Sequence, residues 1–185
     1  MEFYNSNILM DKLHIQKVID IINLKNNHCN ILVFGLGNDS NIWHHSNKHG
    51  YTLFVEDDIE WIENIKKSNE YLSILEYKYK TTVEESIKKI NDSTYLNKFK
   101  IPNEIKMVEW DIIIIDGPAG YTKEQPGRAI PIYWASQIST NNTFIFIDDS
   151  KRNLESKLIT KYIGRTSNTI ELEGRGRFFI KNGLI

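Results

Sequence analysis

Four short runs of Ile, Val, Leu and Phe constrain the fold of this chain more than any other feature. They occupy residues 30–37, 51–56, 110–116 and 143–149, and each is closed by a turn or an acidic residue. Apolar residues stand on consecutive positions rather than on alternate ones, as in Ile112–Ile115. A strand needs that pattern when both of its faces are buried, as in a parallel sheet covered by helices. The runs therefore predict a mainly parallel sheet.

The segments between these runs carry helix-like spacing of apolar residues. They lie at residues 58–69, 83–90, 128–138 and 153–163. Strands that alternate with helices form repeated βα units, whose crossovers are right-handed. We therefore expect an α/β fold of the Rossmann-like type, with helices on both faces of the sheet.

The two ends of the chain add further elements to this prediction. Residues 169–172 and 177–181 have the pattern of two short strands, and the turn between them contains two glycines, which favours an antiparallel hairpin. Residues 8–24 are amphipathic and predict a helix over a sheet edge or the cofactor site. We placed its apolar face at Leu9, Leu13, Val18, Ile21 and Ile22. The whole chain, 1–185, is then one domain, with an N-terminal helical cover at 1–27 and a core at 30–181.

Composition excludes several classes of function. With 23 Lys and Arg against 24 Asp and Glu among 185 residues, the chain offers no electrostatic footprint for nucleic acid or an anionic membrane. Its single cysteine, Cys29, forms no internal disulfide. Charged residues interrupt the apolar positions of 8–24, so neither a membrane span nor an export signal is predicted, and we expect a cytoplasmic protein. The sequence carries no signal for an oligomeric state.

A glycine-rich turn follows the first strand and marks a candidate cofactor site. The strand runs directly into Gly35 and Gly37, and the next strand ends at Glu56, 19 residues after Gly37 (56 − 37 = 19). At the carboxyl ends of such strands, glycines let a ligand approach the backbone, and the acidic residue accepts hydrogen bonds from ribose hydroxyls. The pattern predicts an adenosine-containing cofactor. The candidate cofactor-binding residues are Phe34, Gly35, Gly37, Asn38, Asp39, Ser40, Glu56, Asp57 and Gly117.

The glycine pattern favours S-adenosylmethionine over a dinucleotide. The third position of the dinucleotide fingerprint holds Ser40 rather than Gly or Ala, and no basic residue stands nearby to bind a pyrophosphate. S-adenosylmethionine has no phosphate and suits the loop better. Taken alone, the two glycines also fit an ordinary strand-to-helix turn.

Several motifs together resemble the glucuronoxylan 4-O-methyltransferase-like family, a polysaccharide biosynthesis domain of plant cell-wall enzymes. The resemblance spans residues 30 to about 179. Its motifs are VFGLGNDS at 33–40, FVEDD at 54–58, DGPAGY at 116–121, QPGR at 125–128, Asp148 and EGR at 173–175. It implies methyl transfer from S-adenosylmethionine to a hydroxyl of a polysaccharide sugar, with O4 of glucuronic acid the best-known acceptor.

This chain departs from the plant members of that family in three ways. Gln125 stands where they usually have Ala. The plant members carry an N-terminal membrane anchor and stem, and this sequence shows the pattern of neither. The segments between the strands are also short, so the alternatives to glucuronic acid are another sugar of a polysaccharide or glycan, or a precursor the size of a nucleotide sugar.

Three carboxylates are candidates for the chemistry of transfer. A sugar hydroxyl is hardly ionised at neutral pH, so a group must take its proton. Asp116 ends one strand, and Asp148 and Asp149 end the next. This layout resembles the ligands of cation-dependent catechol-type O-methyltransferases, in which a divalent ion lowers the pKa of the acceptor oxygen. Alternatively, Asp116 acts alone as general base.

The acceptor side is predicted from a loop and the helix that follows it. Arg128, with Lys123 in support, is a candidate clamp for the carboxylate of an acidic sugar; the other interpretation is a structural ion pair with a strand-end Asp. Tyr121 either stacks on a sugar ring or packs the loop. Arg175 and Arg177 are weaker candidates for the same cleft.

Two rival functions remain open from the sequence. One is an NAD-dependent sugar-modifying enzyme, which Ser40 disfavours. The other is a non-catalytic protein of polysaccharide assembly or binding that keeps the fold, although Gly35, Glu56 and Asp116 are all intact.

Overall fold

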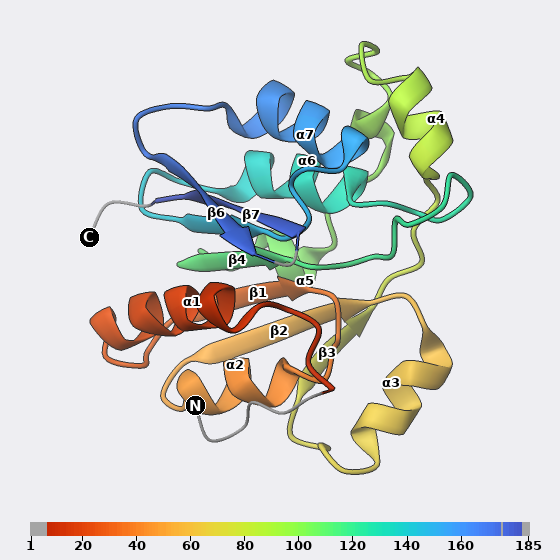
Figure 1. The fold of residues 1–185 in the computed structure, drawn as a ribbon. Helices are drawn as coiled ribbons and strands as arrows, with labels where there is room; N and C mark the ends of the chain where they lie inside the picture. The colour runs from red at the N-terminus through yellow and green to blue at the C-terminus, as the bar shows by residue number, and fades with distance from the viewer. Residues whose placement is uncertain (1–6, 175, 183–185) are drawn as a thin grey trace.

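The strands form one seven-stranded sheet in the order β3-β2-β1-β4-β5-β7-β6 (Figure 1). The structure is a computed structural model, and it describes residues 7–174 and 176–182. The first five strands in this order are parallel, whereas β7 runs antiparallel to β5 and to β6. The mainly parallel sheet and the C-terminal hairpin are both confirmed. The strands are β1 Asn30–Phe34, β2 Tyr51–Glu56, β3 Ser73–Glu76, β4 Ile112–Ile115, β5 Phe144–Ile147, β6 Thr169–Gly174 and β7 Gly176–Lys181.

The centre of the sheet positions the site. β1 lies between β2 and β4, with Leu32 level with Leu53 on one side and with Ile113 on the other. Chain order therefore reverses at β1, which is the switch point where α/β sheets open a crevice at the carboxyl ends of their strands.

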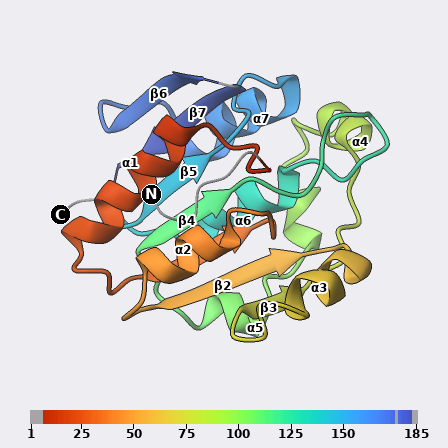
Figure 2. The same ribbon diagram turned by 60° about the horizontal axis from the view of Figure 1, so that its bottom comes forward.

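Helices cover both faces of the sheet, as predicted (Figures 1 and 2). One apolar core joins the sheet to α1, α2 and α3, and the second joins it to α5, α6 and α7. The helices are α1 Lys12–Leu24, α2 Ser40–Ser46, α3 Ile59–Lys66, α4 Val83–Lys88, α5 Asn103–Lys106, α6 Ala129–Ile138 and α7 Asn153–Leu158, with a 3₁₀ turn, η1 Leu96–Lys98, and a π turn, η2 Ile159–Ile163. None of the helices in the described ranges is long and apolar enough to cross a membrane.

Helix α1 exists, but our prediction of its buried face was partly wrong. Leu9 and Leu13 are 68% and 58% exposed. The helix begins at Lys12, where Asp11 caps it, and it buries His14 and Ile15 together with Val18, Ile21 and Ile22. The buried stripe thus starts at a polar residue, which the apolar pattern alone did not include. The helix packs on a face of the sheet rather than at an edge (Figure 2). The division into 1–27 and 30–181 stays a prediction.

Candidate active site

A cleft of about 330 Å³ lies at the carboxyl ends of β1, β2 and β4. It brings together eight residues that the sequence predicted for the site: Gly35, Gly37, Asp39, Glu56, Asp57, Asp116, Gly117 and Tyr121. The other lining residues are Val33, Leu36, Asp58, Pro118 and Ala119. Each stands inside one of the motifs VFGLGNDS, FVEDD and DGPAGY, so the motifs pointed to them although they were not among the candidate contacts.

The floor of the cleft is bare backbone, where the ends of β1 and β4 nearly touch. Gly35 has a φ of +111°, and a Cβ there would lie 3.1 Å from the backbone nitrogen of Gly117. A Cβ on Gly117 would lie 2.8 Å from Cα of Gly35. The Gly117 N–H donates to the carbonyl of Phe34 at 2.7 Å, which holds the two turns together. Both glycines are therefore required for this approach.

Glu56 orders the loops on its side of the cleft. One carboxylate oxygen accepts from the backbone N–H of Leu36 at 2.9 Å, and the other accepts from those of Asp57 and Asp58 at 2.8 and 3.1 Å. Asp58 in turn caps α3 by accepting from the N–H of Trp61 at 3.0 Å. The residue predicted to bind ribose therefore also joins the glycine turn to the end of β2.

Two further carboxyl groups in the cleft are shifted toward the neutral form. Burial raises the pKa of Asp39 to about 6, although its carboxylate accepts from the indole N–H of Trp43 at 3.0 Å. Burial and the neighbouring Glu56 raise the pKa of Asp57 to about 6. Removing carboxylates from water disfavours their charged form, and placing them together adds to the effect.

Arg128 lies beneath the cleft and is not available to a substrate, because it is only 2% exposed. Its Nη2 donates to Asp116 Oδ1 and to Asp149 Oδ2, each at 3.1 Å, and also to the backbone carbonyl of Asp116. Its Nη1 donates to the carbonyl of Asp148. The structure thus supports the structural ion pair and not the clamp for a sugar carboxylate. Lys123, its predicted helper, is exposed beside Glu124, 3.8 Å away.

Asp116 is the carboxyl group of this cluster that faces the cleft. Burial raises its pKa to about 7; the charge of Arg128 opposes the rise, and Asp39, Asp148 and Asp149 add to it. A carboxyl group that exchanges its proton near neutral pH is suited to general base catalysis.

Asp148 differs from Asp116 because it has a second partner. Its Oδ1 lies 3.7 Å from Nδ1 of His14, which is too far for a hydrogen bond and is an ion pair when His14 is protonated. Burial raises the pKa of Asp148, but His14 and Arg128 outweigh burial and lower it below its usual value. The His14 ring stacks on Phe178, with centroids 4.5 Å apart, and its Nε2 lies 3.3 Å from the Glu173 carbonyl. Sequence reasoning missed His14, whose partners lie far along the chain.

The three predicted metal ligands lie close together, but the positively charged guanidinium of Arg128 lies among them. Asp116, Asp148 and Asp149 offer oxygens within 4.8 Å of one another. Divalent ions need oxygen ligands at about 2.0–2.6 Å. Nη2 of Arg128 bridges Asp116 and Asp149, so an ion bound to all three carboxylates would lie against a fixed positive charge. In this arrangement the residues do not fit a divalent ion, and Arg128 supplies the charge that balances the carboxylates.

Tyr121 lies at the mouth of the cleft and is 71% exposed. The guanidinium carbon of Arg152 lies 4.4 Å from its ring centroid, and Arg152 also pairs with Asp149 at 2.7 Å. The Gln125 side chain holds the loop, because its Oε1 accepts from the N–H groups of Tyr121 and Thr122 at 2.6 and 3.0 Å. The departure from the Ala of plant members therefore has a structural role.

Three predicted cofactor residues lie outside the cleft lining. The side chain of Phe34 is fully buried in the core, and only its carbonyl contributes, as described above. Asn38 and Ser40 line a separate cavity of about 190 Å³ on the other side of the glycine turn. Their predicted roles find no support in the cleft geometry.

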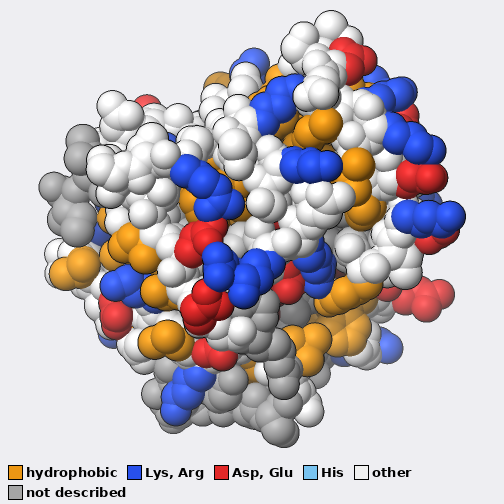
Figure 3. Space-filling view, turned by 45° about the horizontal axis from the view of Figure 1, so that its top comes forward, with side chains coloured by type: hydrophobic (Ala, Val, Ile, Leu, Met, Phe, Trp, Pro, Cys, Tyr) orange, Lys and Arg blue, Asp and Glu red, His pale blue; other side chains and the backbone are white. Residues whose placement is uncertain are grey.

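Arg177 is paired within the hairpin rather than in the cleft. Arg177 pairs with Glu171 and Glu173 on the neighbouring strand, at 2.8 and 2.5 Å. Arg175 lies outside the described residues. The face of the molecule in Figure 3 mixes Lys and Arg with Asp and Glu side chains and shows no large area of one sign.

The strand order, the C-terminal hairpin and the crevice at β1 define a Rossmann-like fold of the methyltransferase type. A solved structure of human methyltransferase-like protein 13 in complex with SAH shares it, with a TM-score of 0.61 at 12% identity over 95% of this chain and 83% of that chain. Such low identity shows the fold alone.

The chain belongs to the family described as IRX15/IRX15L/GXM, whose profile matches residues 13–179. It is 34% identical over 176 residues to glucuronoxylan 4-O-methyltransferase 1 of Arabidopsis thaliana, covering 84% of this chain and 62% of the relative. It is 30% identical over 159 residues to arabinogalactan O-methyltransferase 1 of the same plant, covering 74% and 55%. The chain thus spans somewhat more than half the length of these relatives. The predicted family is confirmed.

Proposed function

We propose that this chain is an S-adenosylmethionine-dependent O-methyltransferase that acts on a sugar hydroxyl of a polysaccharide, a glycan or a glycan precursor. The observation that carries the proposal is the charge of the cleft. Its lining includes Asp39, Glu56, Asp57, Asp58 and Asp116, and no lysine or arginine among the described residues. A sulfonium cofactor is cationic and suits such a site, whereas the pyrophosphate of NAD would meet only like charge.

The names of the relatives support the choice of acceptor. Both the glucuronoxylan and the arabinogalactan enzymes are named as O-methyltransferases of polysaccharides. Among the solved structures of this fold, the human protein is in complex with SAH, the product form of the same cofactor. These likenesses favour a carbohydrate acceptor.

The proposed cofactor contacts use residues of the two glycine turns and the end of β2. S-adenosylmethionine supplies a methyl group on a sulfonium centre when it is bound. Glu56 accepts hydrogen bonds from the ribose hydroxyls, in addition to the backbone groups that it already orders. Gly35 and Gly117 leave room for the cofactor against the backbone, and Asp39 and Asp57 add negative charge around it.

Asp116 acts as the general base in this proposal. Methyl transfer is an in-line displacement: the acceptor oxygen forms a bond to the methyl carbon while the bond from that carbon to sulfur breaks. The hydroxyl proton passes to the carboxylate of Asp116, and Arg128 keeps that carboxylate in place from below. Asp116 bears the proton until solvent removes it.

The exposed Tyr121 and the partly exposed Arg152 take the acceptor role that the sequence had given to Arg128. The ring of Tyr121 offers a flat surface at the cleft mouth. The guanidinium of Arg152 is about a quarter exposed and lies against the Tyr121 ring, with its Nη1 buried. Its exposed part can donate to a sugar hydroxyl or to a uronate carboxylate that stacks on Tyr121.

Calorimetry with S-adenosylmethionine and with NAD tests the cofactor directly. We expect heat of binding from the first and none from the second. Binding of NAD alone would overturn the proposal. Incubation of candidate polysaccharides with cofactor labelled in its methyl group then tests transfer, and the absence of transfer to any carbohydrate despite cofactor binding would favour a non-catalytic role.

Chelation tests whether a metal takes part. With Arg128 among the carboxylates, we expect full transfer activity in EDTA. Loss of activity in EDTA, with recovery on adding a divalent ion, would show that Asp116, Asp148 and Asp149 rearrange around a metal.

A further inference from the structure

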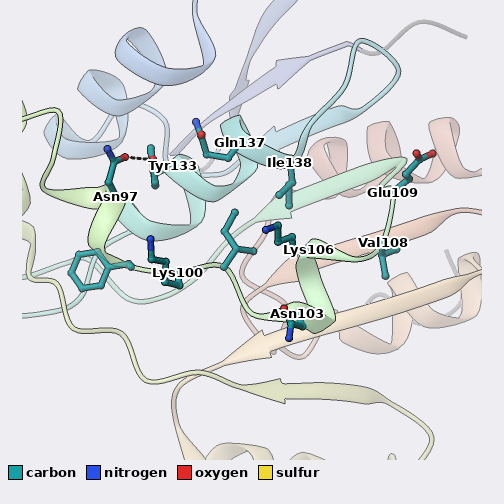
Figure 4. Close-up of a pocket in the computed structure, with 11 residues that line it drawn as sticks. Asn97, Lys100, Asn103, Lys106, Val108, Glu109, Tyr133, Gln137 and Ile138 are labelled. Atoms are coloured by element: carbon teal, nitrogen blue, oxygen red, sulfur yellow. Dashed lines mark hydrogen bonds between the residues drawn. The ribbon is translucent and has the colours of Figure 1, made fainter.

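A second cavity, of about 600 Å³, lies on the molecule far from the cleft (Figure 4). It is formed between α6 and the segment that runs from η1 through α5 to the start of β4. The two cavities share no lining residue. Glu109 lines this cavity just before β4, and Asp116 lines the cleft just after it, so about 20 Å of extended chain separates them. A bound cofactor in the cleft would not reach this cavity.

The floor of the cavity is apolar and its rim is polar. Phe99, Ile101, Val108 and Ile138 contribute the apolar surface. Around it stand amide groups from Asn97, Asn103 and Gln137 and the hydroxyl of Tyr133, which donates to Oδ1 of Asn97 (Figure 4). Sugar rings combine apolar C–H faces with hydroxyl groups at their edges, and this division matches theirs. A volume of this size falls within the usual range of ligand sites.

Two lysines give the cavity its charge. Lys100 and Lys106 both line the cavity, and both are exposed (Figure 4). Lys100 and Lys106 form no ion pair with the residues that the structure describes, unlike Lys25, Lys88 or Lys151. Glu109 is the one acidic residue among the described residues of the lining. Two ammonium groups therefore face one carboxylate, so the cavity favours an anionic ligand.

We propose that the cavity between α6 and the η1–α5 segment is a second binding site for an acidic polysaccharide chain, remote from the methyl transfer site. Lys100 and Lys106 bind its carboxylates, while the amides and the apolar floor receive its sugar rings. The class of ligand rests on the proposed function, which makes a carbohydrate the acceptor. Such a site keeps a long acceptor on the protein while its hydroxyls are presented at the opposite end of the sheet, and it raises their local concentration there.

Affinity electrophoresis in gels that contain xylan tests the site without any methyl donor. The variant is Lys100→Gln with Lys106→Gln. The matched control is Lys48→Gln with Lys67→Gln, which removes the same charge from two other exposed lysines that are not in the cavity. The gels contain either a xylan that bears glucuronic acid or a neutral xylan.

We expect the wild type and the control to be retarded by the acidic xylan, and the cavity variant to bind it roughly tenfold more weakly. Binding of the neutral xylan should change much less. Retention of the acidic xylan by the cavity variant at the wild-type level would overturn the inference. So would an equal loss for acidic and neutral xylan, or a wild type that binds neither.

Calorimetry measures the affinity of the cleft for S-adenosylmethionine separately. The cavity variant should bind this cofactor as the wild type does, and it should methylate a short acceptor at the wild-type rate, while its KM for the polymer rises. Failure to bind S-adenosylmethionine in the wild type would count against the proposed function alone, because retention in the gel does not depend on the cofactor.

Discussion

The two ends of the sheet carry opposite charge. The cleft at the carboxyl ends of the central strands is lined by five acidic residues, whereas the cavity near their amino ends is lined by two lysines and one glutamate. The chain as a whole is almost neutral, at −1. This near-zero net charge conceals a local separation of sign that bears directly on ligands. Charge must therefore be judged at each site.

The two regions also differ in what they are made of. The cleft is formed largely by backbone turns and by carboxylates, one of which, Asp116, a buried arginine holds from below. The cavity is formed by side chains of exposed or half-buried residues that have few partners. Substitutions in the first should affect folding and chemistry, and substitutions in the second should affect binding alone.

The largest contrast is expected from removing one positive charge at each end. Arg128→Met leaves buried carboxylates without a partner and should lower the free energy of unfolding by about 3–5 kcal/mol. Lys106→Met, in the cavity, should change it by less than about 0.5 kcal/mol. Chemical denaturation at pH 7 measures both. At pH 5 the deficit of Arg128→Met should shrink, since protonation relieves the repulsion among the carboxylates. Equal effects of the two substitutions would remove the contrast.

A second contrast concerns carboxyl groups. Asp116→Asn keeps the shape of the side chain but cannot accept a proton, so turnover should fall by roughly 10²-fold or more while cofactor binding persists. Glu109→Gln, in the cavity, serves as the control and should leave turnover on a short acceptor unchanged. Initial rates with saturating cofactor provide the measurement. Near-normal turnover by Asp116→Asn would show that another group takes the proton.

The pH dependence of turnover sharpens the assignment of Asp116. A general base works only when deprotonated, and the pKa of Asp116 is raised to about 7. Turnover should therefore rise about tenfold per pH unit below pH 7 and level off above it. The residual activity of Asp116→Asn should lack this rise. A wild-type profile that is flat from pH 5 to 8 would count against Asp116.

The smallest expected effect lies at the rim of the cleft. Gln125→Ala removes two hydrogen bonds to the backbone of an exposed loop, each worth about 1 kcal/mol or less. We expect KM for the acceptor to rise by roughly two- to fivefold, with cofactor affinity unchanged. Kinetics with varied acceptor and varied cofactor separate the two. A change in cofactor affinity instead would place this loop on the cofactor side.

Much of the cleft could be predicted from the sequence because its geometry follows from local patterns. Gly35, Glu56 and Asp116 each end a buried strand, and the carboxyl ends of parallel strands meet at one edge of a sheet. Strand β3 was missed because no residue of Ser73–Glu76 is fully buried and both of its ends are polar, so it lacks the continuous apolar run of the central strands.

The electrostatics of the site could not be predicted because its partners are distant in sequence. The role of Arg128 depends on carboxylates up to 21 residues away, and that of His14 on Asp148 at the far end of the chain. An arginine that binds a substrate and one that neutralises buried acids have the same local sequence. Only burial distinguishes them, and burial is a property of the folded chain.

The contact between Gly35 and Gly117 limits how this chain can drift through evolution. A side chain at either position meets the backbone of the other, so no change at one glycine can be compensated by a change at its partner. No single substitution is therefore tolerated at either position, and the two glycines should stay unchanged while the surface residues around them diverge. In a library of all single substitutions selected for folding, positions 35 and 117 should both be depleted of every replacement, whereas the exposed Glu124 on the nearby loop should accept most of them.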